Sequence, residues 1–425
     1  MRIARFIFIW LFGLFLVLIP AANPLYGQDY QSFRDELDYI LEKTKLRIGP
    51  FRIFPTFIFS DVGYDNNVYY QREEDNPISD YTATFSPQFK MYLLFRNKLI
   101  FSITENPEYV YYYKQKRERR WNNTLSPEFK LLLLHRFVIS GGYMYRDRRR
   151  RASSEFDVKA NEIRESYRGS LFYETPRRTS FGISASLDEI SYENITLPEE
   201  EIYLSRLLNR EERRGNFELN YRVFSESLFF ISGGYTEYDF EHIQSRWRDS
   251  YSYQVFSGVR FPLFGRVRGA LSLGYRRLLP RQEGKKGFSG LVGNTSLNFR
   301  IMRFGLRFQY IRDFRFSYWT NSIYYTEDRY GSGISFYLTR FLRLDYNFFY
   351  GEANYPEVGL LQMPDGRMEE IKRKDIYRIH IVGFVFRIIR NTGIGVMVNF
   401  WERESNVYWA NRNRMFLGGY ITYEF

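Results

Sequence analysis

Apolar and polar residues alternate one by one along many segments of this chain, and a period of two predicts β-strands with one apolar face. The alternation is clear at residues 181–188, 216–223 and 393–400. Most strand segments carry such a face, and the sequence encodes no helical layer that would cover it. The pattern therefore predicts an all-β fold, a transmembrane barrel whose apolar face contacts lipid.

Short turns interrupt the strand pattern at a regular pitch. Their centres lie near residues 97, 135, 176, 226, 264, 302, 340 and 390. Each interval between turns has room for two strands and one longer loop. Eight turns join sixteen strands, and further strands near 51–63 and 412–425 predict an antiparallel up-and-down barrel of about 18 strands, within a range of 16 to 18. Asn106-Pro107 is expected to mark a bulge or a strand end.

The longer loops are expected at the other end of the barrel. Five charged segments are assigned to them, at about 64–80, 147–162, 190–212, 278–289 and 352–373. Tyrosines near the loop ends of strands suit an interfacial girdle: Tyr143, Tyr145, Tyr235, Tyr275, Tyr310 and Tyr350. The alternative is that tyrosine is merely common in strands. An even strand number with outer long loops predicts that both termini are periplasmic.

Residues 1–27 are predicted to be a signal peptide. Arg2 and Arg5 precede an uncharged apolar run that Pro20 ends, a length typical of a cleaved secretory signal rather than of an anchor helix. The mature protein is therefore expected in the bacterial outer membrane.

Residues 28–49 are expected to form a short periplasmic helical segment before the barrel, which occupies residues 50–425. Ser32 is the predicted N-cap, and Gly49-Pro50 ends the helical pattern. Three roles remain open for this segment: it plugs the lumen, docks a periplasmic partner, or caps the barrel mouth.

Composition excludes several classes of protein. The mean hydropathy of −0.43 leaves no room for repeated apolar helices. Aromatic residues make up 20% of the chain, far more than a disordered chain carries. The absence of cysteine removes disulfide scaffolds, thiolate metal sites and lipoprotein anchors.

Arginine dominates the charge, with 49 arginines against 12 lysines and a formal net charge of +12. If the apolar face is outward, the candidate pore-lining residues are Arg222, Arg260, Arg268, Arg307, Arg343 and Arg378. Guanidinium groups bind carboxylate, phosphate or sulfate, so this lumen favours anionic solutes. The alternative is that these arginines pair with lumenal acids or extend to the barrel edge. Basic segments at 117–120 and 146–151, expected in exposed loops, are candidates for binding lipopolysaccharide phosphates.

No catalytic, cofactor-binding or metal site is expected. Of the three histidines, only His242 has acidic neighbours in one loop, Asp239 and Glu241, and proximity in a charged loop is weak support for catalysis. The sequence contains no nucleophile elbow, phosphate-binding glycine loop or HExxH pattern, so the chain is not expected to be an enzyme. Nucleic acid is not an expected partner, because the chain is predicted to be exported.

The C-terminal residues resemble the assembly signal of bacterial outer-membrane proteins, which the barrel-assembly machinery binds. Phe425 ends the chain, with Tyr423 and Ile421 on the same face. The expected partners are this machinery, outer-membrane lipid and lipopolysaccharide. A homo-oligomer, or a periplasmic partner bound through residues 28–49, stays open.

Two segments resemble a known family. Residues 54–69 contain the run Tyr-Asp-Asn-Asn-Val-Tyr at 64–69, and residues 338–346 resemble a late hairpin of the same family. They are similar to the putative beta-barrel porin family of bacterial outer-membrane proteins, often associated with exopolysaccharide loci. The resemblance covers residues 51–425 and implies an outer-membrane barrel for polysaccharide or anionic solutes. It supplies no site residues.

The expected function is thus a porin-like channel for passive passage of small anionic solutes or for export of polysaccharide, without a cofactor. The alternative is a non-conducting structural or adhesive barrel that binds ligands through its external loops. Barrels of 16 or more strands usually leave an aqueous channel, which favours the first interpretation.

Overall fold

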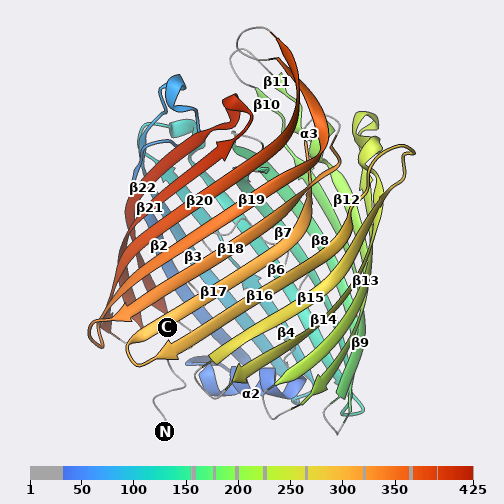
Figure 1. Cartoon of the computed structure of the whole chain (residues 1–425). Helices are drawn as coiled ribbons and strands as arrows, with labels where there is room; N and C mark the ends of the chain where they lie inside the picture. The colour runs from blue at the N-terminus through green and yellow to red at the C-terminus, as the bar shows by residue number, and fades with distance from the viewer. Residues whose placement is uncertain are drawn as a thin grey trace.

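The computed structural model describes residues 32–424 except 154, 156–158, 176–178, 197–200, 224–226, 264–266, 319–321, 363–366 and 390. These residues form a closed antiparallel barrel with 18 wall strands, as predicted (Figure 1). β4 and β5 are two parts of one strand, and β1 is a short extension beside β2. The predicted signal peptide and Phe425 lie outside the described residues.

The wall strands follow one another around the barrel in chain order. Their bounds are β2 Phe51–Asp65, β3 Asp80–Phe95, β4 Leu99–Glu105, β5 Glu108–Tyr112, β6 Arg120–Leu133, β7 Phe137–Arg151, β8 Lys159–Glu174, β9 Thr179–Tyr192, β12 Arg210–Arg222, β13 Leu228–Phe240, β14 Ser250–Leu263, β15 Val267–Pro280, β16 Ser289–Ile301, β17 Phe304–Phe316, β18 Tyr324–Tyr337, β19 Leu342–Gln362, β20 Met368–Ile389, β21 Thr392–Ser405 and β22 Arg412–Glu424. The shorter elements are α2 Phe33–Lys43, β1 Leu46–Ile48, η1 Glu73–Asp75, η2 Lys116–Glu118, β10 Ile195–Thr196, β11 Glu201–Ile202, α3 Leu204–Leu208, η3 Ile243–Arg248 and η4 Tyr408–Ala410. The break between β4 and β5 falls at Asn106-Pro107, as predicted, since proline cannot donate a ladder hydrogen bond.

Antiparallel pairing of the first and last wall strands closes the barrel. Phe57 of β2 lies opposite Tyr423 of β22, and Asp65 lies opposite Phe416. The register shifts between Phe59 and Val62, where Asp61 has a φ of 52°, so the closing seam contains a β-bulge. Closure pairs the two edge strands of the wall with each other, so the barrel itself does not end in an open sheet edge among the described residues.

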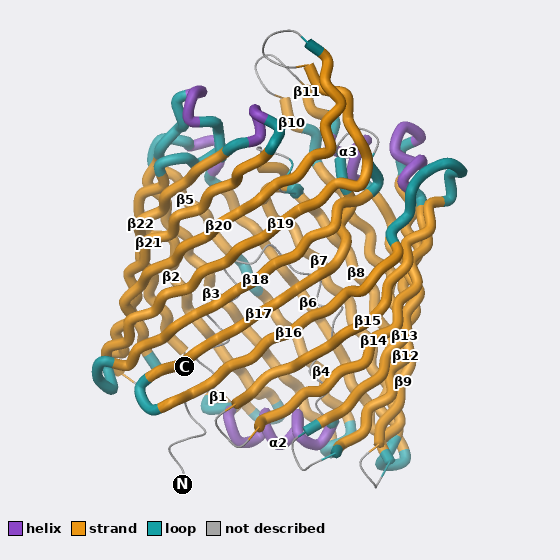
Figure 2. Tube along the Cα trace, in the orientation of Figure 1, coloured by secondary structure: helices purple, strands orange, loops and turns teal. Residues whose placement is uncertain are grey.

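Short turns and long loops occupy opposite ends of the barrel, and the described helices lie at these two ends (Figure 2). The predicted short turns near residues 97, 135, 302 and 340 fall between consecutive wall strands, as predicted. The turns predicted near 176, 226, 264 and 390 include residues outside the described part of the chain. The loop predicted at 352–373 is wrong, because β19 and β20 continue through it as a paired ribbon that projects beyond the barrel (Figure 1). Charge in this segment does not oppose strand pairing, since a ribbon outside the lipid needs no apolar face. Residues 146–151, predicted to be an exposed loop, form the end of β7.

The outer face carries the predicted apolar belt. Phe181 and Ile183 are exposed, as are Phe217 and Tyr221 on the neighbouring strand. The predicted girdle tyrosines share this face, and four of them contact outward rings of adjacent strands: Tyr143, Tyr235, Tyr310 and Tyr350. Tyr310, for example, packs against Tyr330, which is 49% exposed. Exposed rings of this kind suit contact with lipid and the lipid–water interface.

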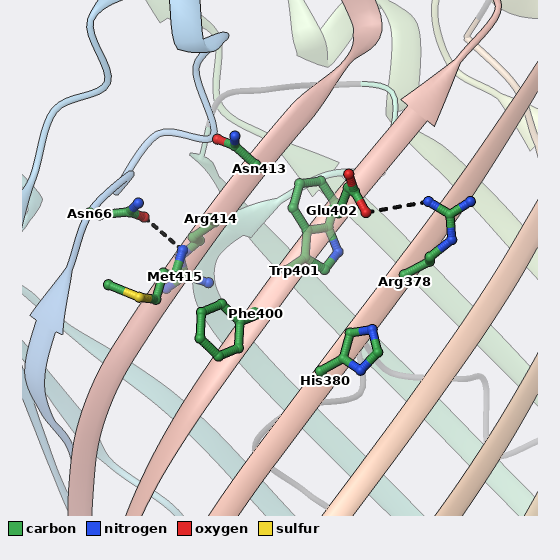
Figure 3. Close-up of a pocket in the computed structure, with 9 residues that line it drawn as sticks. All are labelled: Asn66, Arg378, His380, Phe400, Trp401, Glu402, Asn413, Arg414 and Met415. Atoms are coloured by element: carbon green, nitrogen blue, oxygen red, sulfur yellow. Dashed lines mark hydrogen bonds and ion pairs between the residues drawn. The ribbon is translucent and has the colours of Figure 1, made fainter.

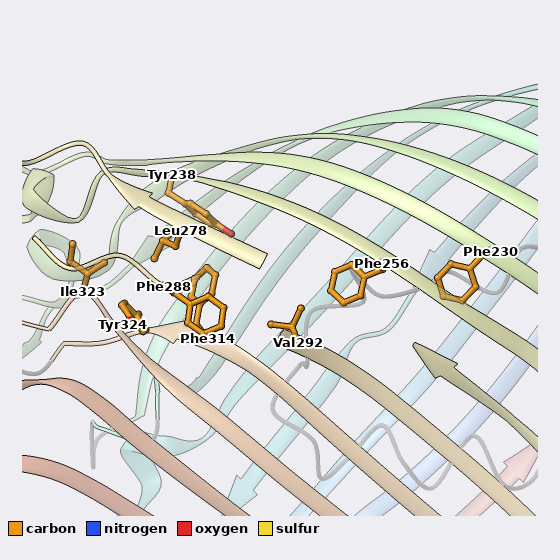
Figure 4. Close-up of a cluster of buried hydrophobic side chains, with 9 residues drawn as sticks. All are labelled: Phe230, Tyr238, Phe256, Leu278, Phe288, Val292, Phe314, Ile323 and Tyr324. Carbon is orange, nitrogen blue, oxygen red and sulfur yellow. The ribbon is translucent and has the colours of Figure 1, made fainter. Parts of the chain in front are cut away.

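Apolar clusters on the inner face form the core. One cluster on β13 to β18 extends from the loop end toward the short-turn end, where Phe230 lies: Phe230, Tyr238, Phe256, Leu278, Phe288, Val292, Phe314, Ile323 and Tyr324 (Figure 4). A second cluster holds helix α2 against the wall at the short-turn end. Its Phe33, Leu37 and Ile40 are buried, and together they pack against Tyr92, Ile100, Leu132 and Val138. These four wall residues point inward, so α2 lies inside the mouth of the barrel.

Hydrogen bonds and one ion pair fix the position of α2. Ser32 caps the helix through Asp35 N, as predicted, at 3.2 Å. Glu36 pairs with Lys130 of β6 at 2.5 Å. None of the described helices is long and apolar enough to cross a bilayer.

Candidate functional site

Five of the six predicted pore-lining arginines lie on the inner face. Successive side chains of a strand point to opposite faces. Neighbours of these arginines on the other parity, such as Leu271 and Phe308, are exposed on the outer face. The inward residues are Arg222, Arg260, Arg268, Arg307 and Arg343.

The prediction for Arg378 is wrong, because this residue lies on the outer face of β20. It shares the parity of Val382 and Phe384, both exposed. Its guanidinium pairs with Glu402 at 3.3 Å and with Glu404 at 2.8 Å on β21. In this part of β20, apolar residues occupy both even and odd positions. The alternation of apolar and polar residues therefore did not determine which face Arg378 occupies.

Arg378 instead lines a shallow groove of about 290 Å³ on the outer wall near the loop end (Figure 3). Phe400 and Met415 supply apolar surface in this groove, and His380 and Glu402 supply polar atoms. The groove lies outside the lumen and contributes nothing to a pore.

Arginine is in excess on one side of the lumen. In the half nearer the short turns, the inward positions of β12 to β20 carry seven arginines in the described residues: the five named above, Arg300 and Arg387. The same positions carry two carboxylates, Glu218 and Asp345. This half of the wall is therefore strongly basic.

Some of these arginines have partners, which agrees in part with the pairing alternative. Arg343 binds Asp345 at 2.8 Å, and Arg260 lies 3.8 Å from Glu218. Arg307 donates to the side-chain oxygen of Asn298 at 3.4 Å. Arg222 forms no ion pair with any described residue. Two carboxylates cannot neutralise seven guanidinium groups, so a positive field remains.

A network of ion pairs that the sequence did not predict lines the lumen nearer the loop end. Several inward arginines there meet a carboxylate, whereas Arg146 and Arg164 have no such partner among the described residues. The pairs are Arg150–Glu162, Arg214–Asp188, Arg276–Asp313, Arg315–Glu327, Arg373–Asp375 and Arg414–Asp65. Most of the carboxylates belong to another strand, so only the barrel register brings them to the arginines.

One contact crosses the lumen at the loop end. Glu155 belongs to the loop after β7, and its carboxylate accepts hydrogen bonds from Ser317 Oγ and Tyr318 N, both at 2.9 Å. Ser317 and Tyr318 follow β17, on the opposite side of the barrel from β7 (Figure 1). Burial raises the pKa of Glu155, although Arg373 and these two hydrogen bonds act in the opposite direction. The contact narrows the passage between the two walls.

The raised pKa predicts a pH-dependent constriction. Burial outweighs the two hydrogen bonds, which favour the ionised form, so the buried position of Glu155 is most stable below the unfolded-state pKa and loses stability as pH rises through the folded-state pKa. Single-channel conductance in planar bilayers is expected to increase from acidic to neutral pH. The Glu155→Gln variant should lose this dependence; the same pH profile in both proteins would contradict the assignment.

The histidine cluster considered for catalysis is not assembled. Asp239 pairs with Arg281 at 2.6 Å, and Glu241 accepts a hydrogen bond from Asn209. His242 accepts from Gln244 N as the cap of η3. Within the described part of the chain, no group of acidic residues and histidines is arranged to hold a metal ion.

Comparison with known proteins assigns the chain to a family. Among solved structures, it is similar to the siderophore receptor PirA from Pseudomonas aeruginosa, with 9% identity, a TM-score of 0.48, and coverage of 90% of this chain and 81% of that one. It is also similar to OccK10 from P. aeruginosa, with 10% identity, a TM-score of 0.44, and coverage of 88% and 97%. The search of curated proteins found no match. The family model described as Putative beta-barrel porin 2 matches residues 42–419, so this chain belongs to that family of outer-membrane barrels.

Proposed function

We propose that this protein is a passive outer-membrane channel for small anionic solutes. The observation that carries the proposal is the excess of inward arginines over carboxylates on β12 to β20. Barrels of 16 to 18 strands are wide enough for an aqueous lumen. A basic wall in such a lumen raises the local concentration of anions and can bind their oxygens in pairs.

The cross-lumen contact favours small solutes over an exported polysaccharide. Glu155 reaches Ser317 and Tyr318 from the other side of the barrel, so a polymer in transit would have to displace this contact. A small anion needs only the space beside it.

We infer that the short turns, helix α2 and the end of β22 face the periplasm, and that the long loops face outward. Outer-membrane barrels have short periplasmic turns and longer external loops, which supports this orientation. The outer girdle and the exposed apolar belt would then contact lipid and lipopolysaccharide.

Charge reversal in the basic half tests the channel proposal. Arg222→Glu combined with Arg268→Glu is expected to reduce the preference for chloride over potassium several-fold, because two positive charges become negative within a narrow aqueous space. The measurement is the reversal potential of single channels under a salt gradient. Arg378→Glu is the matched control, since this arginine lies on the outer wall and should leave selectivity unchanged. An equal loss of anion selectivity in the Arg222→Glu/Arg268→Glu protein and in the Arg378→Glu protein would contradict the proposal.

A non-conducting structural or adhesive barrel is the second candidate. The packing of α2 inside the short-turn mouth favours it, because a seated helix obstructs part of the entrance. A folded barrel that remains silent in bilayers, both with and without residues 28–44, would support this candidate and overturn the channel.

A further inference from the structure

The inner wall between β19 and β22 contains buried polar atoms that lack partners. Asp345 is only 8% exposed; its Oδ2 accepts from Arg343 Nε at 2.9 Å, whereas Oδ1 accepts no hydrogen bond from any described residue. The hydroxyl of Tyr420 on β22 is also buried and without a described partner. Buried polar atoms are almost always satisfied by protein, water or a ligand. These two atoms therefore imply an occupant from outside the chain.

The two orphan groups belong to one niche. Tyr420 lies close enough to Arg343 and Asp345 for their charges to act on it. Its ring lies across Gly395 of β21, where a Cβ would be 2.2 Å from the ring carbons. Gly383 of β20 lies opposite Asp345 in the register. The glycines keep the wall thin between the carboxylate and the phenol, so both can reach one bound molecule.

Cationic groups border the same niche. Arg343 is held by Asp345, and the charge of Arg307 on β17 also acts on this carboxylate. The Tyr337 ring lies 5.9 Å from the Arg343 guanidinium and 5.2 Å from that of Arg300. Two arginines, Arg343 and Arg307, therefore act on one partly satisfied carboxylate, and Arg300 lies on the far side of the Tyr337 ring from this pair.

This combination selects a particular ligand chemistry. Guanidinium groups bind a carboxylate of the ligand through paired hydrogen bonds. The free oxygen of Asp345 repels simple anions but accepts hydrogen bonds from hydroxyl groups, and Tyr420 can donate or accept one. A neutral sugar would leave the arginines unused, and a simple inorganic anion would leave Asp345 unused.

We propose that Arg343, Asp345 and Tyr420 form a lumenal binding site for sugar acids, molecules that carry a carboxylate and several hydroxyl groups. The assignment rests on the proposed channel function and names its preferred solute class. The arginines hold the carboxylate of the sugar acid, and Asp345 and Tyr420 hold its hydroxyl groups.

The test measures the current block by galacturonate in single channels of the full-length mature protein, with galactose and acetate as comparison solutes. Tyr420→Phe removes one hydroxyl and is expected to weaken galacturonate binding about fivefold, the effect of one hydrogen bond, with little change for acetate. Tyr346→Phe is the matched control. Tyr346 neighbours Asp345 in sequence but points outward, so its loss should not change the block.

Asp345→Asn separates recognition from simple electrostatics. Removal of the negative charge should strengthen acetate block, while the advantage of galacturonate over acetate decreases. If galacturonate and acetate change in parallel in both variants, only water satisfies the orphan atoms and the sugar-acid site is overturned. If anion selectivity persists in that case, the channel proposal stands without the sugar-acid site. A barrel that conducts no current would overturn both the channel and the sugar-acid site.

Discussion

Replacing Arg373 by alanine is expected to destabilise the ribbon of β19 and β20 by about 3–5 kcal/mol, because it leaves a buried carboxylate without its cation. Arg373 and Asp375 form an ion pair at 2.7 Å, with side chains 1% and 0% exposed. The guanidinium also lies 5.0 Å from the Tyr355 ring, and Ser405 Oγ donates to Asp375 at 2.6 Å. Asp375 cannot recover its hydration without opening this packing.

Amide hydrogen exchange of the ribbon in detergent micelles measures this effect as a local opening free energy. Arg378→Ala is the matched control, since Arg378 lies on the same strand and also pairs with carboxylates, but its side chain is 34% exposed. Loss of an exposed pair should cost less than about 1 kcal/mol. Equal exchange rates in the two variants would show that burial of the Arg373 pair does not determine the stability of the ribbon.

Replacing Ile40 by aspartate is expected to detach α2 from the inner wall and to raise single-channel conductance. Ile40 is fully buried against the wall. The change removes about 1.5–3 kcal/mol of favourable free energy from hydrophobic burial and adds the cost of burying a charge. Dissociation of the helix from the wall is therefore favoured. The short-turn entrance would widen as a result.

Cysteine labelling reports the detachment directly. The chain contains no cysteine, so Ile100→Cys, beneath α2 on β4, gives a single site that the docked helix protects. Combination with Ile40→Asp should make this thiol react rapidly with a membrane-impermeant maleimide. Asp38→Ala on the exposed side of α2 is the control. Slow labelling and unchanged conductance in the Ile40→Asp protein would mean that the helix stays in place or does not obstruct the pore.

Local patterns predicted most of the barrel because strand faces and tight turns depend on neighbouring residues. The alternation around 181–188 specifies its outward side, and the described short turns, such as those near 97 and 302, separate consecutive wall strands. The same parity placed Arg222 and Arg343 on the inner face. Parity failed for Arg378, because apolar residues occupy both parities of β20 near it. The loop predicted at 352–373 was wrong for another reason, since charge does not distinguish a loop from a ribbon outside lipid.

The ion-pair network and the sugar-acid niche could not be predicted in this way. Arg414 and Asp65 are far apart in the chain and meet only because β2 and β22 close the barrel. Tyr420 joins Asp345 only through the register of β19 to β22, with glycines on the strands between them.

The sequence by itself determined an all-β barrel of about 18 strands, the positions of its short turns and a helix at the N-terminal side, because periodicity, turn residues and capping are local properties. The tertiary structure alone decided which arginines are neutralised, where α2 lies and which loop crosses the lumen. The physical reason is that pairing across a barrel depends on strand register and on distances through the lumen. The contact of Glu155 with Ser317 and Tyr318 spans more than 160 residues of sequence and exists only once the walls face each other.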